Sequence, residues 1–600
     1  MRQISEIVAG FESSRDDLRR SSAARFPLSS GGFLEKPCLR QGRAVYMGSA
    51  PLVLALQVSV RAGTPGDGLM KHPRITLTEL LAKTATRSGR KAAMIFSGTR
   101  ISYSTLLDQA ERLAAGLQAL GLRRGERVAL LMQNCPQFLI AYFGILRADG
   151  VVTATSPIYT SREACHQWID AGARIVIADR SLAATVHGAL PTCPALEFVV
   201  WSDVQTYRSR SYPKLLRLLR TQSKLAPKAD GSLEWIDLLR TGRKPTPART
   251  RPADVACLQY TGGTTGTSKG AMLTHHNLVS NAQQTCGWLT EGRNLAETFV
   301  GALPLFHIYA TTCVMISSIH CGGTVILLPR FELKAVLGVV KKYRPTIFHG
   351  VPTMYVAFNN APNIRSYGFK SLRICMSGGA PLPLQVRETF EALSGGKLLE
   401  GYGLTEASPV THINPTSGAR SGSIGVLIPG TKARIVDLEQ GERDVPEGEA
   451  GELLIRGPQV MKGYWNKPQE TALVLRDGWL HTGDVAKRDA EGFYYIVDRK
   501  KDLIIAGGYN VYPREVEEVL FEHPAVKEAV VIGIPCPYRG ETVKAFVVTQ
   551  PETPVTQEEL VAFCRERLAS YKVPRMIEFR DSLPKSGVGK YLRRELRNGA

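Results

Sequence analysis

The chain of 600 residues is longer than one hydrophobic core usually organises, so at least two domains are expected. Its apolar fraction of 44% and charged fraction of 22% are ordinary for a globular protein and exclude a fibrous or largely disordered chain. The excess of 75 basic over 54 acidic residues leaves a net charge of +21, which suits nucleic acid, an anionic membrane surface or a polyphosphate ligand. A well-solvated basic surface explains the same excess, so charge alone decides nothing.

Cysteine usage and hydropathy restrict the compartment. Eleven cysteines are scattered without a C-x-x-C pair or a Cys/His cluster at zinc spacing, which favours a reducing environment. The longest apolar run near the N-terminus, residues 51–60, is shorter than a membrane-spanning helix, contains Gln57 and lies far from Met1. We therefore predict a cytoplasmic protein, with peripheral contact at the inner face of the membrane left open.

The beginning of the chain differs from the rest. Residues 1–72 are rich in Arg, Ser and Gly and show little periodicity, so we predict a poorly ordered N-terminal extension. A translation start near Met70 is the alternative. From Ile75 onward the pattern becomes that of a globular protein.

Helices and short apolar strands alternate through most of the chain. Apolar residues at helical spacing predict helices over residues 77–86 and 103–120. Apolar runs predict strands over residues 92–96, 127–132, 150–154, 174–178 and 323–328. This alternation indicates parallel α/β layers. Residues 212–228 form a basic amphipathic stretch, for which we predict a surface helix, with a membrane-contacting helix as the alternative.

The last hundred residues have a different pattern. Helices are predicted over residues 513–523 and 556–568, and strands over residues 526–534 and 543–549, which together make a compact α+β unit. The predicted fold class is therefore α/β, with a large N-terminal domain of layered α/β subdomains and a small α+β C-terminal domain. We place the N-terminal domain at residues 73–498, the C-terminal domain at residues 499–600, and a hinge at residues 498–501.

The most informative segment is a Gly- and Thr-rich loop at residues 260–270, directly after a strand predicted over residues 256–260. Its glycines allow tight turns and close approach of the backbone to a ligand. Its threonine hydroxyls and the ammonium group of Lys269 supply donors for phosphate oxygens. The spacing does not fit the P-loop of kinases and GTPases. A flexible linker is the alternative, which the lysine between glycines after a strand disfavours.

The same loop resembles the phosphate-binding signature of the adenylate-forming superfamily, which contains acyl-CoA synthetases, luciferases and peptide-synthetase adenylation domains. Further segments resemble signatures of this superfamily in the same order: residues 303–308, 377–382, 401–409, 479–484, 498–504, 507–510 and 584–590. The resemblance extends from about residue 75 to residue 597. It implies an enzyme that forms an acyl-adenylate from ATP and then an acyl-CoA, with a mobile C-terminal domain that rotates between the two half-reactions.

The resemblance also implies roles for individual residues. Those that would bind ATP or AMP are Thr261, Gly262, Gly263, Thr264, Thr265, Gly266, Thr267, Lys269, Gly379, Ala380, Pro381, Gly401, Tyr402, Gly403, Asp484 and Arg499. The catalytic residues would be Lys590, Thr405, Glu406 and His307, with Glu406 also a ligand of Mg²⁺. The hinge residue would be Lys501, the CoA tunnel residues Gly507, Gly508 and Tyr509, and the acyl-pocket residues His307, Val351 and Gly378.

The charges of these residues suit the reaction. A carboxylate must approach the α-phosphate, which is also an anion, so the site has to neutralise charge and hold the reactants in line. Mg²⁺ prefers carboxylate, water and phosphate ligands, which makes Glu406 the candidate. Lys590, a point charge in a glycine-containing loop, suits a group that enters and leaves the site, although alone it would be an ordinary solvated lysine. Two positions depart from the family pattern: Lys501 stands where many members carry Asp, and Ser268 where Pro is commonest.

Each of the other side chains also has an ordinary structural explanation. Glu406 could simply begin a helix. Asp484 and Arg499 could form a surface ion pair. Tyr402, whose ring face could stack on adenine, could instead be a core residue. His307 could likewise be a hydrogen-bonded core histidine.

Three segments point to the acid. Residues 348–355 resemble the G-V-P-T-x-Y segment of long-chain fatty acyl-CoA ligases, and residues 508–519 and 538–544 resemble bacterial members of that group. We therefore predict an AMP-forming fatty acyl-CoA synthetase that uses ATP, Mg²⁺ and CoA on a medium- or long-chain fatty acid. A coumarate-like aryl acid–CoA ligase and a fatty-acyl-AMP ligase are the alternatives with the same fold.

Two other classes of protein do not fit the sequence. A basic nucleic-acid- or membrane-binding protein would need a DNA-reading module or basic clusters with exposed aromatic residues, and the sequence shows neither, so no nucleic-acid partner is expected. A serine hydrolase would need a G-x-S-x-G elbow, but Cys375 stands two residues before Ser377. A monomer and a homodimer both stay open.

Overall fold

The computed structural model describes residues 73–242, 244–261, 268–290, 297–506, 509–536, 540–551, 553–585 and 591–598. These residues belong to one unit that spans Ala62–Ala600. The N-terminal extension predicted over residues 1–72 lies outside the described residues.

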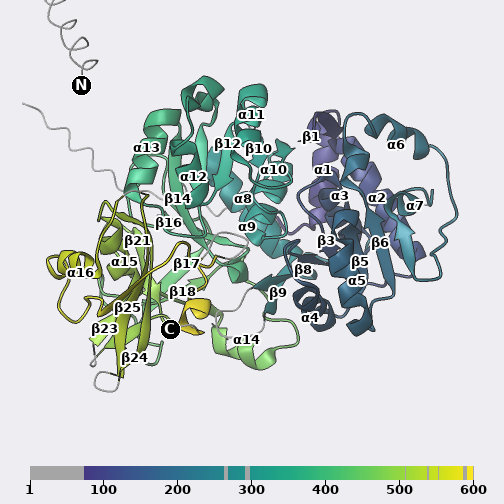
Figure 1. The fold of residues 1–600 in the computed structure, drawn as a ribbon. Coiled ribbons are helices and arrows are strands. Elements are labelled where there is room, and N and C mark those ends of the chain that lie inside the picture. Colours follow the sequence, from purple (N-terminus) through teal and green to yellow (C-terminus); the bar gives the residue numbers. More distant parts are fainter. Residues whose placement is uncertain are drawn as a thin grey trace, which may run out of the picture. The chain divides into compact units, whose positions relative to one another are not determined.

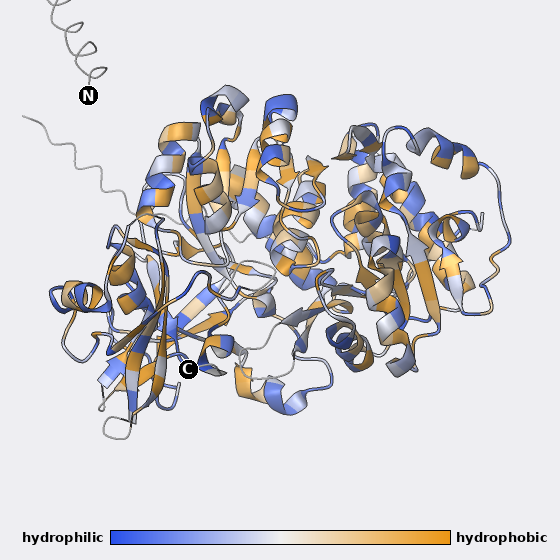
Figure 2. Cartoon of the chain, viewed as in Figure 1, coloured by the Kyte–Doolittle hydropathy of each residue, from blue (hydrophilic) through white to orange (hydrophobic). Residues whose placement is uncertain are grey.

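The first layered region is built on a seven-stranded sheet of order β7-β6-β5-β3-β4-β8-β9 (Figure 1). Its strands are β3 (Arg127–Leu131), β4 (Val151–Thr155), β5 (Ala173–Asp179), β6 (Phe198–Ser202), β7 (Ser232–Glu234), β8 (Val255–Thr261) and β9 (Lys269–Thr274). All neighbours are parallel except β8 and β9. Strand β5 is buried along almost its whole length, as expected for a parallel strand covered on both faces, and Figure 2 shows the central strands as mostly apolar.

Helices cover both faces of this sheet. The apolar core on one face includes residues of α2 (Tyr103–Ala119) and α3 (Pro136–Arg147). The core on the other face includes residues of α4 (Ser161–Ala171) and α5 (Ala183–Ala189). The predicted strands over residues 127–132, 150–154 and 174–178 and the predicted helix over residues 103–120 are confirmed to within one or two residues at each end.

The second layered region is a nine-stranded sheet of order β16-β15-β14-β13-β12-β10-β11-β1-β2. Its strands are β1 (Ala92–Phe96), β2 (Thr99–Ser102), β10 (Thr298–Gly301), β11 (Thr324–Leu327), β12 (Ile347–Gly350), β13 (Ile374–Ser377), β14 (Lys397–Gly403), β15 (Val410–Ile413) and β16 (Val426–Leu427). Neighbouring strands are parallel from β14 through β13, β12, β10 and β11 to β1. Strand β2 pairs antiparallel with β1, and β15 pairs antiparallel with both β14 and β16. A Ser-Gly turn joins β1 to β2 with positive φ at both Ser97 and Gly98, as a tight hairpin requires.

Long helices flank the centre of this sheet (Figure 1). Helix α8 (His275–Thr290) shares a core with β13, β14 and β15, whereas α11 (Leu333–Tyr343), α12 (Pro352–Asn359) and α13 (Leu384–Ser394) carry residues of the larger core. The chain between β10 and β11 forms α9 (Ile308–Ala310), a π-helical segment η4 (Thr311–Ile316) and α10 (Ser317–His320). Helix α1 (Leu77–Ser88) confirms the predicted first helix.

A third sheet and a separate C-terminal unit complete the fold. The third sheet contains β17 (Lys432–Val436), β18 (Gly451–Arg456), β19 (Leu475–Arg476), β20 (Trp479–Arg488) and β21 (Tyr494–Arg499), and α14 (Pro468–Val474) precedes β19. The C-terminal sheet contains β22 (Ile504–Ala506), β23 (Tyr509–Val511), β24 (Val526–Cys536), β25 (Gly540–Thr549) and β26 (Met576–Phe579). Its helices are α15 (Pro513–Phe521), α16 (Gln557–Arg565) and α17 (Arg593–Asn598). This unit has its own apolar core, so the predicted fold class of a large α/β domain and a small α+β domain is confirmed.

One predicted element is mostly wrong. In the basic stretch over residues 212–228, only α6 (Tyr212–Leu218) is helical, and α7 (Trp235–Leu239) follows later. The amide of Ser223 instead donates to the carbonyl of Arg240, and that of Lys228 donates to Ser232. These contacts with the following segment replace the hydrogen bonds that would have continued the helix.

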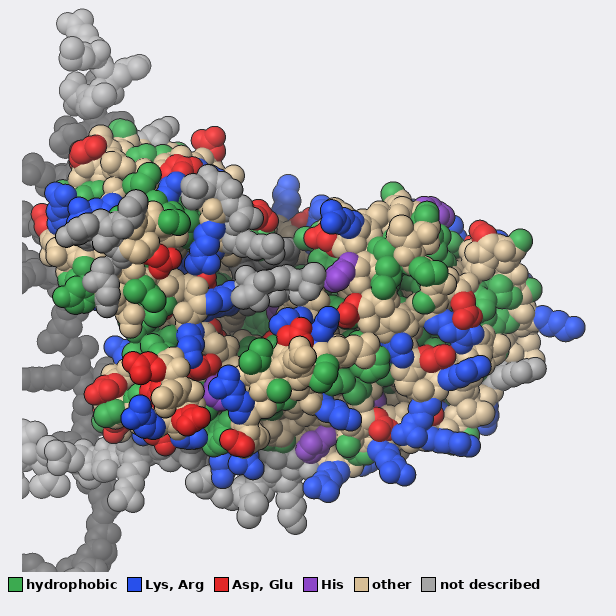
Figure 3. Space-filling view, turned by 90° about the horizontal axis from the view of Figure 1, so that it is seen from below, with side chains coloured by type: hydrophobic (Ala, Val, Ile, Leu, Met, Phe, Trp, Pro, Cys, Tyr) green, Lys and Arg blue, Asp and Glu red, His purple; other side chains and the backbone are tan. Residues whose placement is uncertain are grey.

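The basic charge is dispersed over the face seen in Figure 3, where Lys and Arg side chains form several separate groups with acidic side chains between them. Among the described residues, no helix combines the length and apolarity needed to cross a bilayer. The cytoplasmic location and the membrane contact stay predictions.

Candidate active site

The two ends of the Gly/Thr-rich loop are held together. Strand β8 ends at Thr261, strand β9 begins at Lys269, and these two residues pair across the antiparallel ladder. The hydroxyl of Ser268 donates to the carbonyl oxygen of Thr261 at 2.6 Å, so the residue that departs from the family pattern closes the neck of the loop. The predicted phosphate-binding residues between these stems, Gly262, Gly263, Thr264, Thr265, Gly266 and Thr267, lie outside the described residues.

The strand that leaves this loop is paired on its other edge with residues 462–465. The amide of Met272 donates to the carbonyl of Gly463 at 2.8 Å, and that of Trp465 donates to Gly270 at 2.8 Å. Between them, Tyr464 bridges to Ala271 and places its ring 5.3 Å from the ammonium nitrogen of Lys269. A distant segment is thereby built into the edge of the phosphate loop.

Glu406 is held by this added edge. The hydroxyl of Tyr464 donates to Glu406 Oε1 at 2.7 Å, and the amide of Met461 donates to the Glu406 carbonyl at 2.7 Å. Burial and the neighbouring carboxylate raise the pKa of Tyr464, so its hydroxyl keeps the proton that it donates. Glu406 does lie in a short 3₁₀ turn, Thr405–Ala407, as its structural alternative proposed, but its side chain is also oriented by a specific partner.

The described residues around Glu406 suit a magnesium ion whose other ligands are water and phosphate oxygens. They contain no cluster of three or more His, Cys, Asp or Glu side chains that could hold a metal ion by themselves. Mg²⁺ commonly binds through one or two carboxylates with the remaining positions filled by water and substrate phosphates. An oriented carboxylate beside a phosphate loop therefore suits an ion that arrives with the nucleotide.

A second group of side chains joins β14 to β20 and β21. The hydroxyl of Tyr402 donates to Asp484 Oδ2, and Arg499 Nε lies 3.5 Å from Asp484 Oδ1. Asp484 and Arg499 are cross-strand neighbours in the register of β20 and β21. The ion pair proposed as their structural alternative is thus present, yet a carboxylate with about four acceptor sites can still accept from ribose hydroxyls.

Glycines keep the ends of β13 and β14 open. A Cβ atom on Gly378 would approach the ring of Tyr309 to 3.3 Å, and one on Gly403 would approach the carbonyl oxygen of Pro409 to 2.1 Å. Gly379 has a positive φ of 84°. A Cβ atom on Gly378 would also lie 3.5 Å from the carbonyl oxygen of Gly401, so β14 and the segment of residues 378–381, which includes the predicted Ala380 and Pro381, approach closely there.

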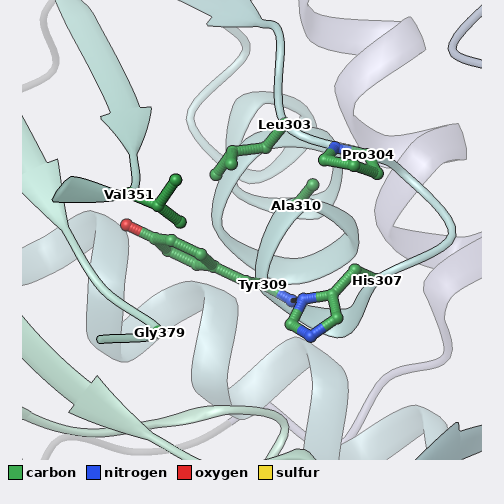
Figure 4. A pocket seen from close by; sticks show the side chains of 7 residues that line it. All are labelled: Leu303, Pro304, His307, Tyr309, Ala310, Val351 and Gly379. Atoms are coloured by element: carbon green, nitrogen blue, oxygen red, sulfur yellow. Dashed lines mark hydrogen bonds between the residues drawn. The ribbon is translucent and has the colours of Figure 1, made fainter. Parts of the chain in front are cut away.

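A small apolar pocket lies beside these strand ends (Figure 4). It is lined by Leu303, Pro304, His307, Tyr309, Ala310, Val351 and Gly379. The Tyr309 ring lies along the pocket, with its hydroxyl end on the side of Val351 (Figure 4). His307 Nδ1 accepts from the amide of Tyr309 at 3.2 Å, which leaves Nε2 as the position for the ring proton of the neutral imidazole. Of the predicted acyl-pocket residues, His307 and Val351 line this pocket, and Gly378 lies against Tyr309.

The predicted hinge, residues 498–501, begins in the last two residues of β21. Asp498 is buried and accepts from the amides of Arg499 at 2.7 Å and Arg514 at 2.8 Å, while burial raises its pKa to about 6. Lys500 Nζ lies 3.0 Å from Glu452 Oε2, whereas the side chain of Lys501 is exposed. The chain is therefore fixed up to residue 500 on one side of the predicted hinge residue.

The stems of the loop that carries Lys590 are also held. Lys585 pairs with Tyr591 in an isolated antiparallel bridge, and Arg593 Nη2 donates to both carboxylate oxygens of Glu517 at 2.6 and 2.8 Å. Lys590 itself and the predicted tunnel residues Gly507 and Gly508 lie outside the described residues. Tyr509, the third tunnel residue, is exposed and stacks on Tyr571 with 4.7 Å between ring centroids.

Residues 81–465 match the family of AMP-binding enzymes, and residues 515–590 match the AMP-binding enzyme C-terminal domain. The chain belongs to the AMP-binding enzyme family. A long-chain-fatty-acid–CoA ligase of Bacillus subtilis (strain 168) is 46% identical over 541 residues, which cover 87% of this chain and 94% of that protein. A feruloyl-CoA synthase of an Amycolatopsis species is 39% identical and covers 86% of this chain and 97% of its own length. The crystal structure of the anthranilate CoA ligase AuaEII with anthranoyl-AMP has a TM-score of 0.77 and 27% identity, covering 88% of this chain and 97% of that chain.

Two positions in this AMP-binding enzyme were missed by the sequence reasoning. Tyr464, which orients Glu406, lies 58 residues further along the chain, and nothing in its local pattern indicates that contact. The sequence places Tyr260 where the predicted strand meets the loop, without a role for its side chain, yet its hydroxyl donates to Asp170 Oδ2 at 2.6 Å and so ties the strand before the phosphate loop to α4. Only the match between their hydroxyls and distant carboxylates could have suggested these residues.

Proposed function

We propose that this AMP-binding enzyme is an AMP-forming fatty acyl-CoA synthetase. It activates a medium- or long-chain fatty acid with ATP to acyl-AMP and pyrophosphate, and then transfers the acyl group to CoA. The observation that carries the proposal is the 46% identity to the B. subtilis long-chain-fatty-acid–CoA ligase over 94% of that enzyme. Such coverage leaves no large part of the relative unmatched.

In the first half-reaction, the residues around the phosphate loop bind and orient ATP. Glu406, fixed by Tyr464, would hold Mg²⁺, which supplies neutralisation of the phosphate charge when bound. Asp484 accepts from the ribose hydroxyls, and Thr405 and Lys269 donate to phosphate oxygens. Lys590 contributes its charge at the α-phosphate, where negative charge accumulates as the carboxylate attacks.

The acid enters from the pocket beside His307. The proton on His307 Nε2 lets the side chain donate to a carboxylate oxygen, and the apolar pocket walls exclude water from the acyl-adenylate. In the second half-reaction, the CoA thiol needs a path and the removal of Lys590, which a rotation of residues 499–600 about Lys501 provides. The boundary between domains at residues 498 and 499 is part of the same proposal.

The test is ATP–pyrophosphate exchange over a chain-length series of fatty acids, with aryl acids included, followed by CoA-dependent AMP release. We expect exchange that fatty acids stimulate and AMP release that requires CoA. Failure of every carboxylic acid to stimulate exchange contradicts the enzymatic assignment. Exchange without CoA-dependent release supports a fatty-acyl-AMP ligase instead.

The role of Lys590 is tested by separating the half-reactions. Lys590→Ala is expected to abolish exchange but to spare thioester formation from supplied acyl-adenylate. Lys527→Ala, on the exposed side of β24 in the same C-terminal unit, is the matched control and should change neither. Equal loss of both half-reactions in Lys590→Ala contradicts the two-state assignment.

An aryl acid is the second candidate substrate. The feruloyl-CoA synthase of Amycolatopsis supports it through its 39% identity over 97% of its length. The same exchange series decides between the two, because each class of acid is offered at equal concentration to one enzyme.

A further inference from the structure

His349, on strand β12, has a buried polar side chain with no role in the proposed reaction. It is 1% exposed, and neither ring nitrogen has a hydrogen-bond partner among the described residues. Burial lowers its pKa to about 3, so the ring is neutral and offers one N–H donor and one acceptor nitrogen. Because buried polar groups are nearly always hydrogen-bonded, two unused ring nitrogens call for a ligand.

His349 lies on the same side of its strand as the pocket. The backbone is extended through Val351, and alternate residues of an extended chain point to the same face. Val351 lines the apolar pocket, so His349 lies one step, or ~6.6 Å, deeper along that wall. The rings of Tyr309 and His349 are nearly perpendicular with 5.6 Å between centroids, and Phe299 stacks with His349 at 6.3 Å.

Tyr309 lies between the pocket, which it lines, and His349, which its ring contacts. Its hydroxyl donates to the carbonyl of Met376 at 3.3 Å, which is long for an O–H···O bond. Gly378 lies against the ring, where a Cβ atom would approach it to 3.3 Å. Two residues after Tyr309 begins the π-helical segment η4 (Thr311–Ile316), a rare conformation that is frequent at functional sites.

We propose that His349 is the polar contact of a distal acyl subsite, which binds a hydroxyl group carried on the chain of the acid. This proposal rests on the proposed function, since it places the group on a fatty acid activated at this site. A hydroxyl can accept from the N–H of a neutral imidazole or donate to its other nitrogen, so it can pair with one ring nitrogen whichever tautomer is present. A carboxylate does not fit, because the neighbouring rings of Phe299 and Tyr309 supply no positive charge.

The depth of His349 predicts where the hydroxyl lies on the chain. An extended covalent chain advances ~1.2 Å per bond, as in a polypeptide that spans ~3.6 Å in three bonds. The step from Val351 to His349 therefore corresponds to about five to six bonds beyond the carbon that contacts Val351. A single position on the chain, rather than a general tolerance of hydroxyl groups, is expected to be favoured.

The experiment compares hexadecanoic acid with a series of hydroxyhexadecanoic acids in which the hydroxyl moves along the chain. We expect kcat/KM in the exchange assay to peak at one position, about five- to tenfold above hexadecanoic acid, as one neutral hydrogen bond allows. His349→Leu should abolish the peak and raise kcat/KM for hexadecanoic acid, while His349→Gln, which keeps a donor and an acceptor, should retain part of the peak.

The controls separate this subsite from a structural role. His320→Leu replaces another largely buried histidine, on α10, and should leave the peak in place. A flat series in the wild-type enzyme, with hexadecanoic acid active, overturns the subsite and leaves the proposed function intact. An equal fall of kcat/KM for all acids in His349→Leu, with a lower Tm, also overturns it, because the histidine then acts only on packing. Absence of exchange with every acid contradicts the proposed function itself.

Discussion

Tyr464→Phe tests whether the orientation of Glu406 sets the response of the enzyme to magnesium. The substitution removes the 2.7 Å hydrogen bond to Glu406 Oε1 and keeps the ring that packs beside Lys269. A hydrogen bond to a charged group contributes ~1.5–3 kcal/mol, and the partly buried position of this bond favours the lower end. A loss of ~1.5 kcal/mol corresponds to about a tenfold change in an equilibrium constant.

We therefore expect Tyr464→Phe to raise the magnesium concentration for half-maximal exchange about tenfold at fixed ATP, because Glu406 holds the binding geometry less often. The rate at saturating magnesium should recover most of the wild-type value. The assay is ATP–pyrophosphate exchange over a magnesium titration with hexadecanoic acid as substrate.

A matched control removes an equivalent bond elsewhere. The hydroxyl of Tyr495 donates to Asp489 Oδ2 at 2.9 Å in the loop after β20, away from Glu406. Tyr495→Phe should leave the magnesium titration unchanged. An unaltered titration in Tyr464→Phe, or the same shift in both variants, refutes the reasoning.

Three further predictions concern stability and modification. Burial raises the pKa of Glu400 to about 7. Ionisation of this group therefore lowers the free energy of unfolding by up to ~3 kcal/mol as pH rises from about 4.5 through 7. Glu400→Gln should reduce the fall of Tm between pH 5 and pH 8. Arg593→Lys replaces the bidentate pair with Glu517 by a point charge and should cost ~1–3 kcal/mol in urea unfolding of the C-terminal unit. Cys165 and Cys193 are buried with their sulfur atoms 2.9 Å apart, so a diazene oxidant should take both thiol hydrogens and leave a disulfide, measured as a loss of two titratable thiols.

Each of these has an outcome that contradicts it. A Tm profile of Glu400→Gln that is parallel to the wild type means that Glu400 does not carry the pH dependence. Unchanged urea unfolding of Arg593→Lys means that the single charge of a lysine stabilises the C-terminal unit as well as the two hydrogen bonds from the arginine do. Loss of two thiols in Cys193→Ser as well places the oxidation at other cysteines.

The sequence predicted the layers well, because apolar periodicity reports local burial. The strand predicted over residues 174–178 is β5, whose apolar run is buried on both faces. The basic stretch over residues 212–228 misled the same reasoning, since its helical pattern competes with the contact between Ser223 and Arg240, which no local pattern reveals.

The residues of the candidate site likewise fall into those that the sequence could predict and those that it could not. Segments such as residues 479–484 could be recognised because glycine, aspartate and hydroxyl residues stand close together in the sequence. The bond from Tyr464 to Glu406, and the burial of His349 with no hydrogen-bond partner among the described residues, arise only when distant strands meet. Tertiary contacts of this kind leave no periodicity and no spacing to detect.

The pairing of β9 with residues 462–465 has a consequence for the newly made chain. Gly270 leaves the ribosome about 195 residues before Trp465, which closes its ladder, and at ~5–20 residues per second this interval lasts ~10–40 s. During that time the outer edge of β9 has no partner, and an open strand edge is a template for wrong pairing between chains. Slow synthesis between these two segments should therefore lower the yield of active enzyme, although the finished protein is identical.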